Sequence, residues 1–162
     1  MTTPLPYRQH DHAHCVEHAL ADARDICKRS GARLTPIRER VLQLIWQSHQ
    51  PLGAYELLAA LSQDGHQAAP PTVYRALDFL QQHGLVHRIA SLNAFVGCPH
   101  AGRAHTGCFL ICQSCRNVLE LTDKEISAAI EQQSQRQGFK IDHVIVEIAG
   151  QCPACQQAAA TS

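Results

Sequence analysis

Two Cys-x-x-Cys pairs are the residues of this chain whose type and spacing most clearly indicate chemistry. They are Cys112-Gln-Ser-Cys115 and Cys152-Pro-Ala-Cys155. A gap of two residues lets one turn present two thiolates to the same ion, and Zn²⁺ takes four tetrahedral ligands at about 2.3 Å from sulfur. Two pairs in one small chain therefore favour a structural zinc site over redox dithiols or unrelated surface thiols.

The spacing between the pairs also predicts structure. Residues 116–151 exceed the roughly 15–20 residues that separate the pairs of a compact zinc ribbon, so a strand–helix–strand unit is expected inside the loop that the metal closes. The segment Met1–His14 is polar and lacks the apolar core of a secretory signal. Eight cysteines in such a chain predict a reducing, cytoplasmic location in which metal binding outranks disulfides.

Length and charge limit the possible classes of protein. A length of 162 residues allows one domain or two small ones, and no run approaches the roughly 18 apolar residues of a membrane span. A formal net charge of zero argues against a strongly basic nucleic-acid binder. However, residues 24–90 hold eight Lys and Arg against five acids, whereas residues 91–162 hold five against six. This asymmetry permits DNA binding by the first half.

The first half reads as helices followed by a hairpin. Apolar residues recur at helical spacing, and Thr35-Pro36 is a strong helix start, with a hydroxyl N-cap before a proline. Two β-prone runs then flank a short polar turn. The pattern is typical of a winged helix-turn-helix. The predicted helices are 16–29, one that starts at Thr35-Pro36, 55–61 and 72–83, and the predicted hairpin strands are 85–89 and 94–97.

The second half reads as a small α+β unit of three strands and one helix. The predicted strands are 108–112, 117–121 and 140–148, and a helix with Asp123 as its N-cap runs to about Gln137. Such a unit buries too little apolar surface to be stable alone, so both a metal and a dimer interface are expected. The predicted divisions are a flexible His-rich tail 1–15, a winged-helix DNA-binding domain 16–97, a linker 98–106, a dimerisation and metal-binding domain 107–155 and a disordered tail 156–162.

Several motifs together carry a resemblance to a known family. They are Thr35-Pro36-Ile37-Arg38, the run Pro71-Thr72-Val73-Tyr74-Arg75-Ala76-Leu77-Asp78-Phe79-Leu80, Gly84-Leu85-Val86-His87 and the two Cys pairs. In this order they resemble the ferric uptake regulator proteins over roughly residues 18–155, and within that family the zinc uptake regulators. The fold that this implies is α+β: an N-terminal winged helix-turn-helix DNA-binding domain and a small C-terminal α+β dimerisation domain with structural zinc.

The resemblance also implies metal sites. It assigns His87, Cys98, His105 and Glu120 as a regulatory zinc site and Cys112, Cys115, Cys152 and Cys155 as a structural one, which makes two Zn²⁺ sites per subunit. Taken alone, His87 would read as an ordinary wing residue. Mixed nitrogen, sulfur and oxygen ligands suit Zn²⁺ better than harder metals such as Mn²⁺. Where iron-sensing relatives carry a His-rich cluster, this chain has Thr106-Gly107-Cys108-Phe109, and Cys108 is expected to be a strand residue rather than an extra ligand.

DNA binding is the expected output. The second helix of a helix-turn-helix enters the major groove, which here is helix 72–83, and Arg75 can bind guanine through two hydrogen bonds. Thr72 and Tyr74 suit phosphate contacts, and the resemblance adds Tyr55 as a base or backbone contact and Arg33 as a minor-groove contact. The alternatives are partial core packing for the two tyrosines and a solvated helix face for Arg75.

The predicted function is a zinc-responsive transcriptional repressor. As a zinc-loaded homodimer it would bind a palindromic, A·T-rich operator in double-stranded DNA and repress zinc-uptake genes, with no membrane partner and no small organic substrate. The alternative is an iron- or peroxide-responsive repressor of the same family, which Cys98 fits poorly. A zinc deaminase is excluded because the His-x-Glu of its signature is absent, so no enzyme is predicted. The cluster His10, His12, His14, Cys15 and His18 is expected to be a mobile tail, with metal scavenging as the alternative.

Overall fold

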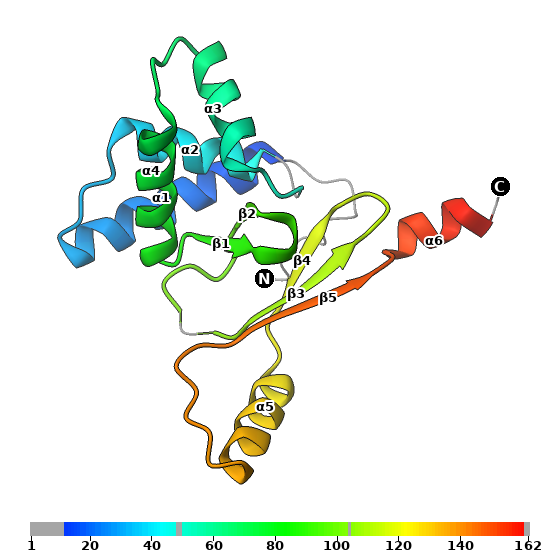
Figure 1. Cartoon of the computed structure of the whole chain (residues 1–162). Coiled ribbons are helices and arrows are strands. Elements are labelled where there is room, and N and C mark those ends of the chain that lie inside the picture. The colour runs from blue at the N-terminus through cyan, green and yellow to red at the C-terminus, as the bar shows by residue number, and fades with distance from the viewer. Residues whose placement is uncertain (1–11, 48–49, 104, 161–162) are drawn as a thin grey trace.

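The computed structural model describes residues 12–47, 50–103 and 105–160. Four helices make up the first half of the chain (Figure 1). Their bounds are α1 His12–Ser30, α2 Pro36–Trp46, α3 Ala54–Gln63 and α4 Pro70–Gln82. They bury one core, to which α2 contributes Val41, Leu42, Leu44 and Ile45. No helix among the described residues is long and apolar enough to cross a membrane.

The helix starts follow local sequence signals. Thr35 is extended and occupies the N-cap of α2 before Pro36, although its side chain makes no capping hydrogen bond. At α3, the backbone N–H of Gly53 donates to the Glu56 carboxylate at 2.7 Å, which satisfies a donor at the helix start. Helix α4 begins two residues before the predicted Thr72, with two prolines in its first turn, where proline is tolerated because those N–H groups have no helical acceptor.

A two-stranded hairpin, here called the wing, follows the helices. It consists of β1 (Val86–Ile89) and β2 (Ala94–Gly97), antiparallel and joined by the 3₁₀ turn η1 (Ala90–Leu92). Asn93 closes the turn in the left-handed region at φ 47°, which Asn tolerates better than most residues, and its side-chain oxygen accepts a hydrogen bond from Arg88 at 2.9 Å. The predicted hairpin is therefore confirmed.

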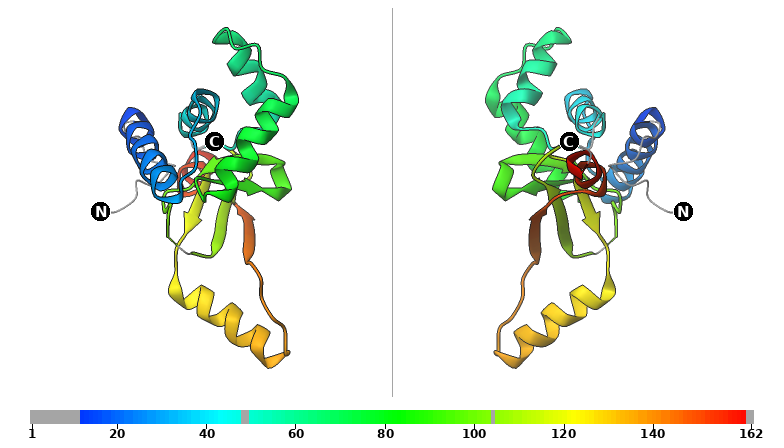
Figure 2. Two further views of the ribbon diagram at one scale, coloured as in Figure 1. Left: turned by 90° about the vertical axis from the view of Figure 1, so that its left-hand side faces the viewer. Right: turned by 90° about the vertical axis from the view of Figure 1, so that its right-hand side faces the viewer.

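The second half contains one mixed sheet, two helices and both Cys-x-x-Cys pairs. Strand β3 (Gly107–Cys112) lies between β4 (Val118–Leu121), which is antiparallel to it, and β5 (Ile145–Gly150), which is parallel to it. Helix α5 (Lys124–Arg136) provides the crossover, and the Asp123 carboxylate caps it by accepting from the backbone N–H of Glu125 and Ile126. Figure 2 shows the sheet between the helical half and α5.

Two predictions at the C-terminal end differ from the structure. The third strand was predicted at 140–148 but begins at Ile145 and continues to Gly150, because its parallel register with β3 pairs Gly107 with Ile145 and Cys112 with Gly150. The tail predicted as disordered from residue 156 is helical to Ala160 in α6 (Pro153–Ala160). Its Ala/Gln composition favours helix, and proline suits the first helical position.

The N-terminal tail also differs from the prediction where it is described. Residues 12–15 belong to α1, whereas residues 1–11 lie outside the described residues, as do positions 104, 161 and 162 within the predicted linker and tail. Helix α1 therefore starts four residues earlier than predicted.

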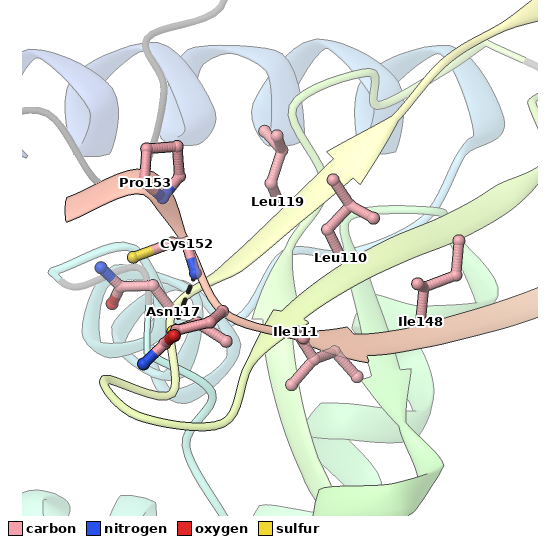
Figure 3. A pocket seen from close by; sticks show the side chains of 10 residues that line it. Leu110, Ile111, Asn117, Leu119, Ile148, Cys152 and Pro153 are labelled. Atoms are coloured by element: carbon pink, nitrogen blue, oxygen red, sulfur yellow. Dashed lines mark hydrogen bonds between the residues drawn. The ribbon is translucent and has the colours of Figure 1, made fainter. Parts of the chain in front are cut away.

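The wing packs on one face of the second-half sheet. Ile89 of β1 is fully buried in an apolar cluster with Phe109 and Ile111 of β3 and Val118 of β4. The opposite face carries Leu110, Leu119 and Ile148, which line a hollow of about 140 Å³ beside Cys152 and Pro153 (Figure 3). One face of the sheet therefore packs against the wing, and the other face is exposed in the single chain.

Candidate metal centres

The four Cys-x-x-Cys thiols meet at one end of the sheet. Their sulfur atoms all lie within 4.8 Å of one another, and the Sγ atoms of Cys115 and Cys152 are 3.8 Å apart. Four sulfurs in a tetrahedron about 2.3 Å from a central zinc would lie about 3.8 Å apart. The thiol cluster, Cys112, Cys115, Cys152 and Cys155, therefore has the composition and spacing of a closed zinc site.

Local backbone structure assembles this thiol cluster. After β3, the chain turns back because the N–H of Cys112 donates to Asn117 O at 2.9 Å and the N–H of Arg116 donates to Cys112 O at 2.8 Å. Arg116 lies in the left-handed region at φ 61°. The N–H of Gln113 donates to Gly150 O at 2.8 Å, so the end of β5 is held beside this turn and the second pair follows two residues later.

Backbone donors stabilise a thiolate in the thiol cluster. The backbone N–H of Cys115 is the largest cause that lowers the pKa of Cys112, to about 6, and partial burial opposes it. The N–H of Cys152 adds a hydrogen bond to Cys112 Sγ at 3.3 Å. Because zinc binds the thiolate form, this cysteine is in its ligand form at neutral pH.

A second cluster joins the two halves of the chain. His87 lies on β1, Cys98 follows β2, His105 precedes β3 and Glu120 lies on β4, so four separate segments contribute. Their ligand atoms all lie within 4.8 Å of one another, and we call them the wing cluster. The shortest separations are 2.8 Å from His105 Nε2 to Glu120 Oε1, 3.1 Å from His87 Nε2 to Glu120 Oε1, 3.2 Å between the two Nε2 atoms and 3.5 Å from Cys98 Sγ to His105 Nε2.

The wing cluster has the chemistry of a metal site. The Glu120 side chain is only 3 % exposed, and within the described residues neither of its carboxylate oxygens accepts a hydrogen bond. A buried carboxylate without such partners is costly unless a cation neutralises it. His105 Nδ1 lies 2.7 Å from the carbonyl oxygen of Arg103, so this nitrogen carries the proton and Nε2 presents its lone pair to the cluster.

Packing fixes the position of Cys98. Its neighbour Gly97 lies against the indole of Trp46, and a Cβ atom at position 97 would come within 2.2 Å of Trp46 Cε2. The thiol itself is buried. Burial first, and then the negative charge of Glu120, raise the pKa of Cys98 to about 12. A cation is therefore needed to convert this cysteine to a thiolate.

Other candidate ligands lie outside both clusters. Cys108 is buried in β3, as expected for a strand residue. In α1, His18 Nδ1 lies 3.2 Å from Asp22 Oδ2, and His14 and Cys15 lie in the preceding turn, while His10 and the side chain of His12 fall outside the described part of the chain. Across the described residues, only the thiol cluster and the wing cluster bring three or more ligand atoms together.

The predicted DNA-contacting residues lie on the helical half, and several are exposed. Tyr55 at the start of α3 is 73 % exposed and Tyr74 on α4 is 44 % exposed, so neither is packed into the core. Arg75 and Arg33 are exposed and Thr72 is half-buried. Elsewhere in this half, Arg24 pairs with Glu39 and Arg40 pairs with Asp64. Among the described residues no such ion pair neutralises Arg33 or Arg75, which leaves these two charges available to an anionic partner.

Two contacts between the halves were not foreseen from the sequence. Gln50 Nε2 donates to the carbonyl oxygen of Cys115 at 2.9 Å, and the Glu147 carboxylate accepts from the backbone N–H groups of Ala90 and Ser91. Both join residues far apart in the chain, and no local pattern marks them. Only the packing of the wing on the sheet brings these partners together.

Comparison with known proteins places the chain in a family. The model of the ferric uptake regulator family matches residues 29–149. The chain is 38 % identical over 141 residues to the zinc uptake regulation protein of Escherichia coli K12, a match that covers 86 % of this chain and 82 % of that protein. A zinc uptake regulator complexed with zinc and DNA superimposes with a TM-score of 0.84 at 37 % identity, over 90 % of this chain and 97 % of that one.

A third relative distinguishes two conformations. The holo form of XcZur superimposes with a TM-score of 0.80 at 40 % identity, over 88 % of this chain and 99 % of that one. Its apo form gives 0.51 at 39 % identity, over 87 % and 97 %. At nearly equal identity and coverage, the backbone of this chain is therefore more similar to the holo form of this relative than to its apo form. By sequence and by structure, the chain belongs to the ferric uptake regulator family.

Proposed function

We propose that this chain is a zinc-responsive transcriptional repressor, which as a zinc-loaded homodimer binds a palindromic operator and represses zinc-uptake genes. The observation that carries the proposal is the wing cluster, which joins the DNA-binding half to the second half through four ligands from separate segments. The zinc uptake regulators among its relatives are regulatory proteins, which supports a regulatory role over an enzymatic one.

The two clusters have different roles in this proposal. Cys112, Cys115, Cys152 and Cys155 would hold a structural Zn²⁺, because all four lie in the second half and saturate a tetrahedral ion. His87, Cys98, His105 and Glu120 would hold a regulatory Zn²⁺, giving two sites per subunit. The buried Glu120 carboxylate and the buried Cys98 thiol support this assignment, because both gain a counter-charge from the ion.

The position of the wing cluster explains how zinc would control DNA binding. A ligand shifts an equilibrium between two states only if it binds them with different affinity. His87 lies on the wing and Glu120 on the sheet, so all four ligands converge only when the wing lies against the sheet. Zinc would therefore stabilise that arrangement, which sets the spacing of the two recognition helices in a dimer.

DNA recognition is assigned to α4 and its surroundings. In this assignment Arg75 reads a base, Thr72 and Tyr74 contact phosphates, Tyr55 contacts a base or the backbone, and Arg33 reaches the minor groove. The exposed Tyr55 and Tyr74 and the unneutralised Arg33 and Arg75 support it, because buried or ion-paired side chains could not serve. Recognition helices of a dimer about 34–36 Å apart would read a palindrome.

The exposed face of the sheet supports homodimer formation. Leu110 and Ile148 on that face are exposed in the single chain. Figure 3 shows Leu110, Leu119 and Ile148 projecting from adjacent strands beside the start of α6. Contiguous exposed apolar residues of this kind mark an interaction surface, and a second copy that covers this face would extend the small core of the second half.

The test is DNA binding by the purified dimer across buffered concentrations of free metal. Operator binding that appears with Zn²⁺ and disappears on chelation is expected, with no comparable response to Fe²⁺ or to peroxide. Binding that persists without metal would overturn the proposal. A response to iron or peroxide alone would favour the alternative repressor, which the thiol among the wing ligands argues against.

A matched pair of arginine variants tests the DNA-reading helix. Arg75→Ala removes a base contact worth about 1–3 kcal/mol, so operator affinity should fall about tenfold or more and discrimination at one base pair should be lost. Arg136→Ala, at the end of α5 in the second half, is the control and should leave affinity unchanged. Equal losses in both variants would show a general charge effect instead of base reading.

A further inference from the structure

Three residues from neighbouring strands form a row across the face of the sheet that meets the wing. Phe109 on β3 is in register with Glu120 on β4 and with Glu147 on β5. Residues in register on adjacent strands point to the same face of a sheet. The row Glu120–Phe109–Glu147 therefore spans the full width of the sheet beneath the wing, and only its first member belongs to the wing cluster.

Each member of the row contacts a successive part of the wing. Glu120 lies 3.1 Å from His87 Nε2. The Phe109 ring lies 5.2 Å, centroid to centroid, from the His87 ring and shares the apolar cluster with the fully buried Ile89. At the other edge, the Glu147 carboxylate accepts hydrogen bonds from Ala90 N at 2.6 Å and from Ser91 N at 3.0 Å. The wing is thus held at both edges of the sheet.

The Glu147 carboxylate accepts from two backbone N–H groups at the wing tip and also interacts with the Ser91 side chain. Ala90 and Ser91 open the 3₁₀ turn η1, where the first N–H groups have no acceptor within the turn, and the carboxylate provides one for each. Partial burial raises the pKa of Glu147, but the hydrogen bonds from Ser91 and Ala90 outweigh it and hold the pKa below its ordinary value. The side chain is therefore ionised at neutral pH, and hydrogen bonds to an ionised acceptor are stronger than neutral ones.

We propose that Glu147 is a positioning residue that latches the wing tip to β5 and thereby sets how much zinc the regulatory site requires. It acts on the arrangement of the two halves and touches neither metal ligand nor DNA-reading residue. The latch rests on the proposed function in one respect, that the wing cluster senses zinc. The latch goes beyond the proposed function because it lets β5, a strand that also contributes to the exposed apolar face, affect the position of the DNA-binding half.

Linkage predicts a distinctive signature for such a latch. If only the latched arrangement presents all four ligands, the apparent zinc affinity equals the intrinsic affinity multiplied by the fraction of molecules in that arrangement. Loss of the latch lowers that fraction, so more zinc is needed to reach half-maximal DNA binding. Saturating zinc restores the arrangement, and operator affinity there stays at the wild-type value.

Two variants weaken the latch from opposite sides. Glu147→Gln keeps the size of the side chain and removes its charge. Ala90→Pro removes the donor of the shorter hydrogen bond, and proline is tolerated here because Ala90 is exposed, opens η1 and follows the extended Ile89. Glu131→Gln, on the exposed side of α5, is the matched control for loss of one carboxylate.

The first measurement is the zinc affinity of the regulatory site, by competition with a chelator in the absence of DNA. The second is operator binding as a function of free zinc, which gives the zinc concentration for half-maximal binding (the midpoint) and the operator affinity at saturating zinc (the plateau). Both latch variants should raise the midpoint and weaken the regulatory site about tenfold, with the double variant close to either single one. Dimer mass, the metal of the thiol cluster and plateau operator affinity should stay unchanged, as should every property of Glu131→Gln. A wild-type midpoint in Glu147→Gln, or a lower plateau affinity, would overturn the latch. If the wild type showed no zinc-dependent DNA binding, the proposed function would fail, and chelator competition would still decide the latch.

Discussion

The thiol cluster and the wing cluster both gather four ligands, but they depend on the fold in different ways. The thiol cluster uses two short turns of one half, each with its own spacing signal, and its geometry needs only the β3–β5 pairing. The wing cluster draws one ligand from each of four segments and exists only where the wing lies on the sheet. In the proposed function, metal at the first site would stabilise a domain, whereas metal at the second would select an arrangement of two domains.

Removal of a thiol ligand should have the largest effect. Cys112→Ser is expected to release the structural metal and unfold the second half, because structural zinc sites of this type contribute about 10–16 kcal/mol to folding in small peptides. Metal analysis should show loss of one zinc per chain, circular dichroism should show loss of secondary structure, and light scattering should show loss of the dimer. Cys15→Ser, whose thiol lies in α1, is the control. A soluble, fully active Cys112→Ser dimer would erase the distinction between the two clusters.

Removal of a wing-cluster ligand should abolish the response and leave the fold intact. Cys98→Ser and His87→Ala are each expected to weaken the regulatory metal by more than about a hundredfold, beyond the 10–100-fold typical of lost outer-shell partners. The dimer and the thiol-cluster metal should persist. Cys108→Ser, a buried thiol outside both clusters, should retain zinc-dependent operator binding. Unfolding of Cys98→Ser would mean that the wing cluster is structural as well.

An intermediate effect on zinc binding is expected from a substitution at Gly97, the residue before the wing-cluster ligand Cys98. In Gly97→Ala the added methyl group would overlap the Trp46 indole, and overpacking of this kind costs about 1–3 kcal/mol. The displaced backbone should shift Cys98 and weaken the regulatory site without affecting the thiol cluster. Trp46 is the single tryptophan of the chain, so its fluorescence reports the local change directly. Unaltered fluorescence and zinc affinity would show that the wing adjusts freely.

The smallest expected effect is the dependence of zinc affinity on pH. The pKa of Cys98 is raised to about 12, so its thiol is protonated at neutral pH without metal and must lose that proton on binding zinc. Because this thiol releases one proton on binding, its contribution should raise the zinc affinity of the wing cluster about tenfold for each unit of pH increase. In the thiol cluster the pKa of Cys112 is lowered to about 6, but that of Cys115 is raised and that of Cys155 is raised to about 12, so zinc binding there releases protons as well. Zinc competition at several pH values would measure the slope of the regulatory site, and a zinc affinity that does not change with pH would contradict the raised pKa of Cys98.

Much of the fold followed from local signals in the sequence. Thr35-Pro36, the Asp123 cap and the turn around Asn93 each act within a few residues, so the first five helices, the hairpin and the strands of the second half could be predicted with errors at their ends, whereas the order of those strands in the sheet was not. The late start of β5 was missed because its bounds depend on the parallel register with β3. The C-terminal helix α6 was missed because its alanine- and glutamine-rich sequence reads as a tail when considered alone.

The candidate sites divide in the same way. The sequence by itself determined the thiol cluster, because a thiolate pair two residues apart fixes its own geometry within one turn. It could propose His87, Cys98, His105 and Glu120 only through resemblance, and it gave no sign of Glu147 or Gln50. Tertiary structure alone decided that the wing crosses the row Glu120–Phe109–Glu147. The physical reason is that contacts between distant segments depend on the packing of Ile89 and Phe109, and local spacing carries no record of that packing.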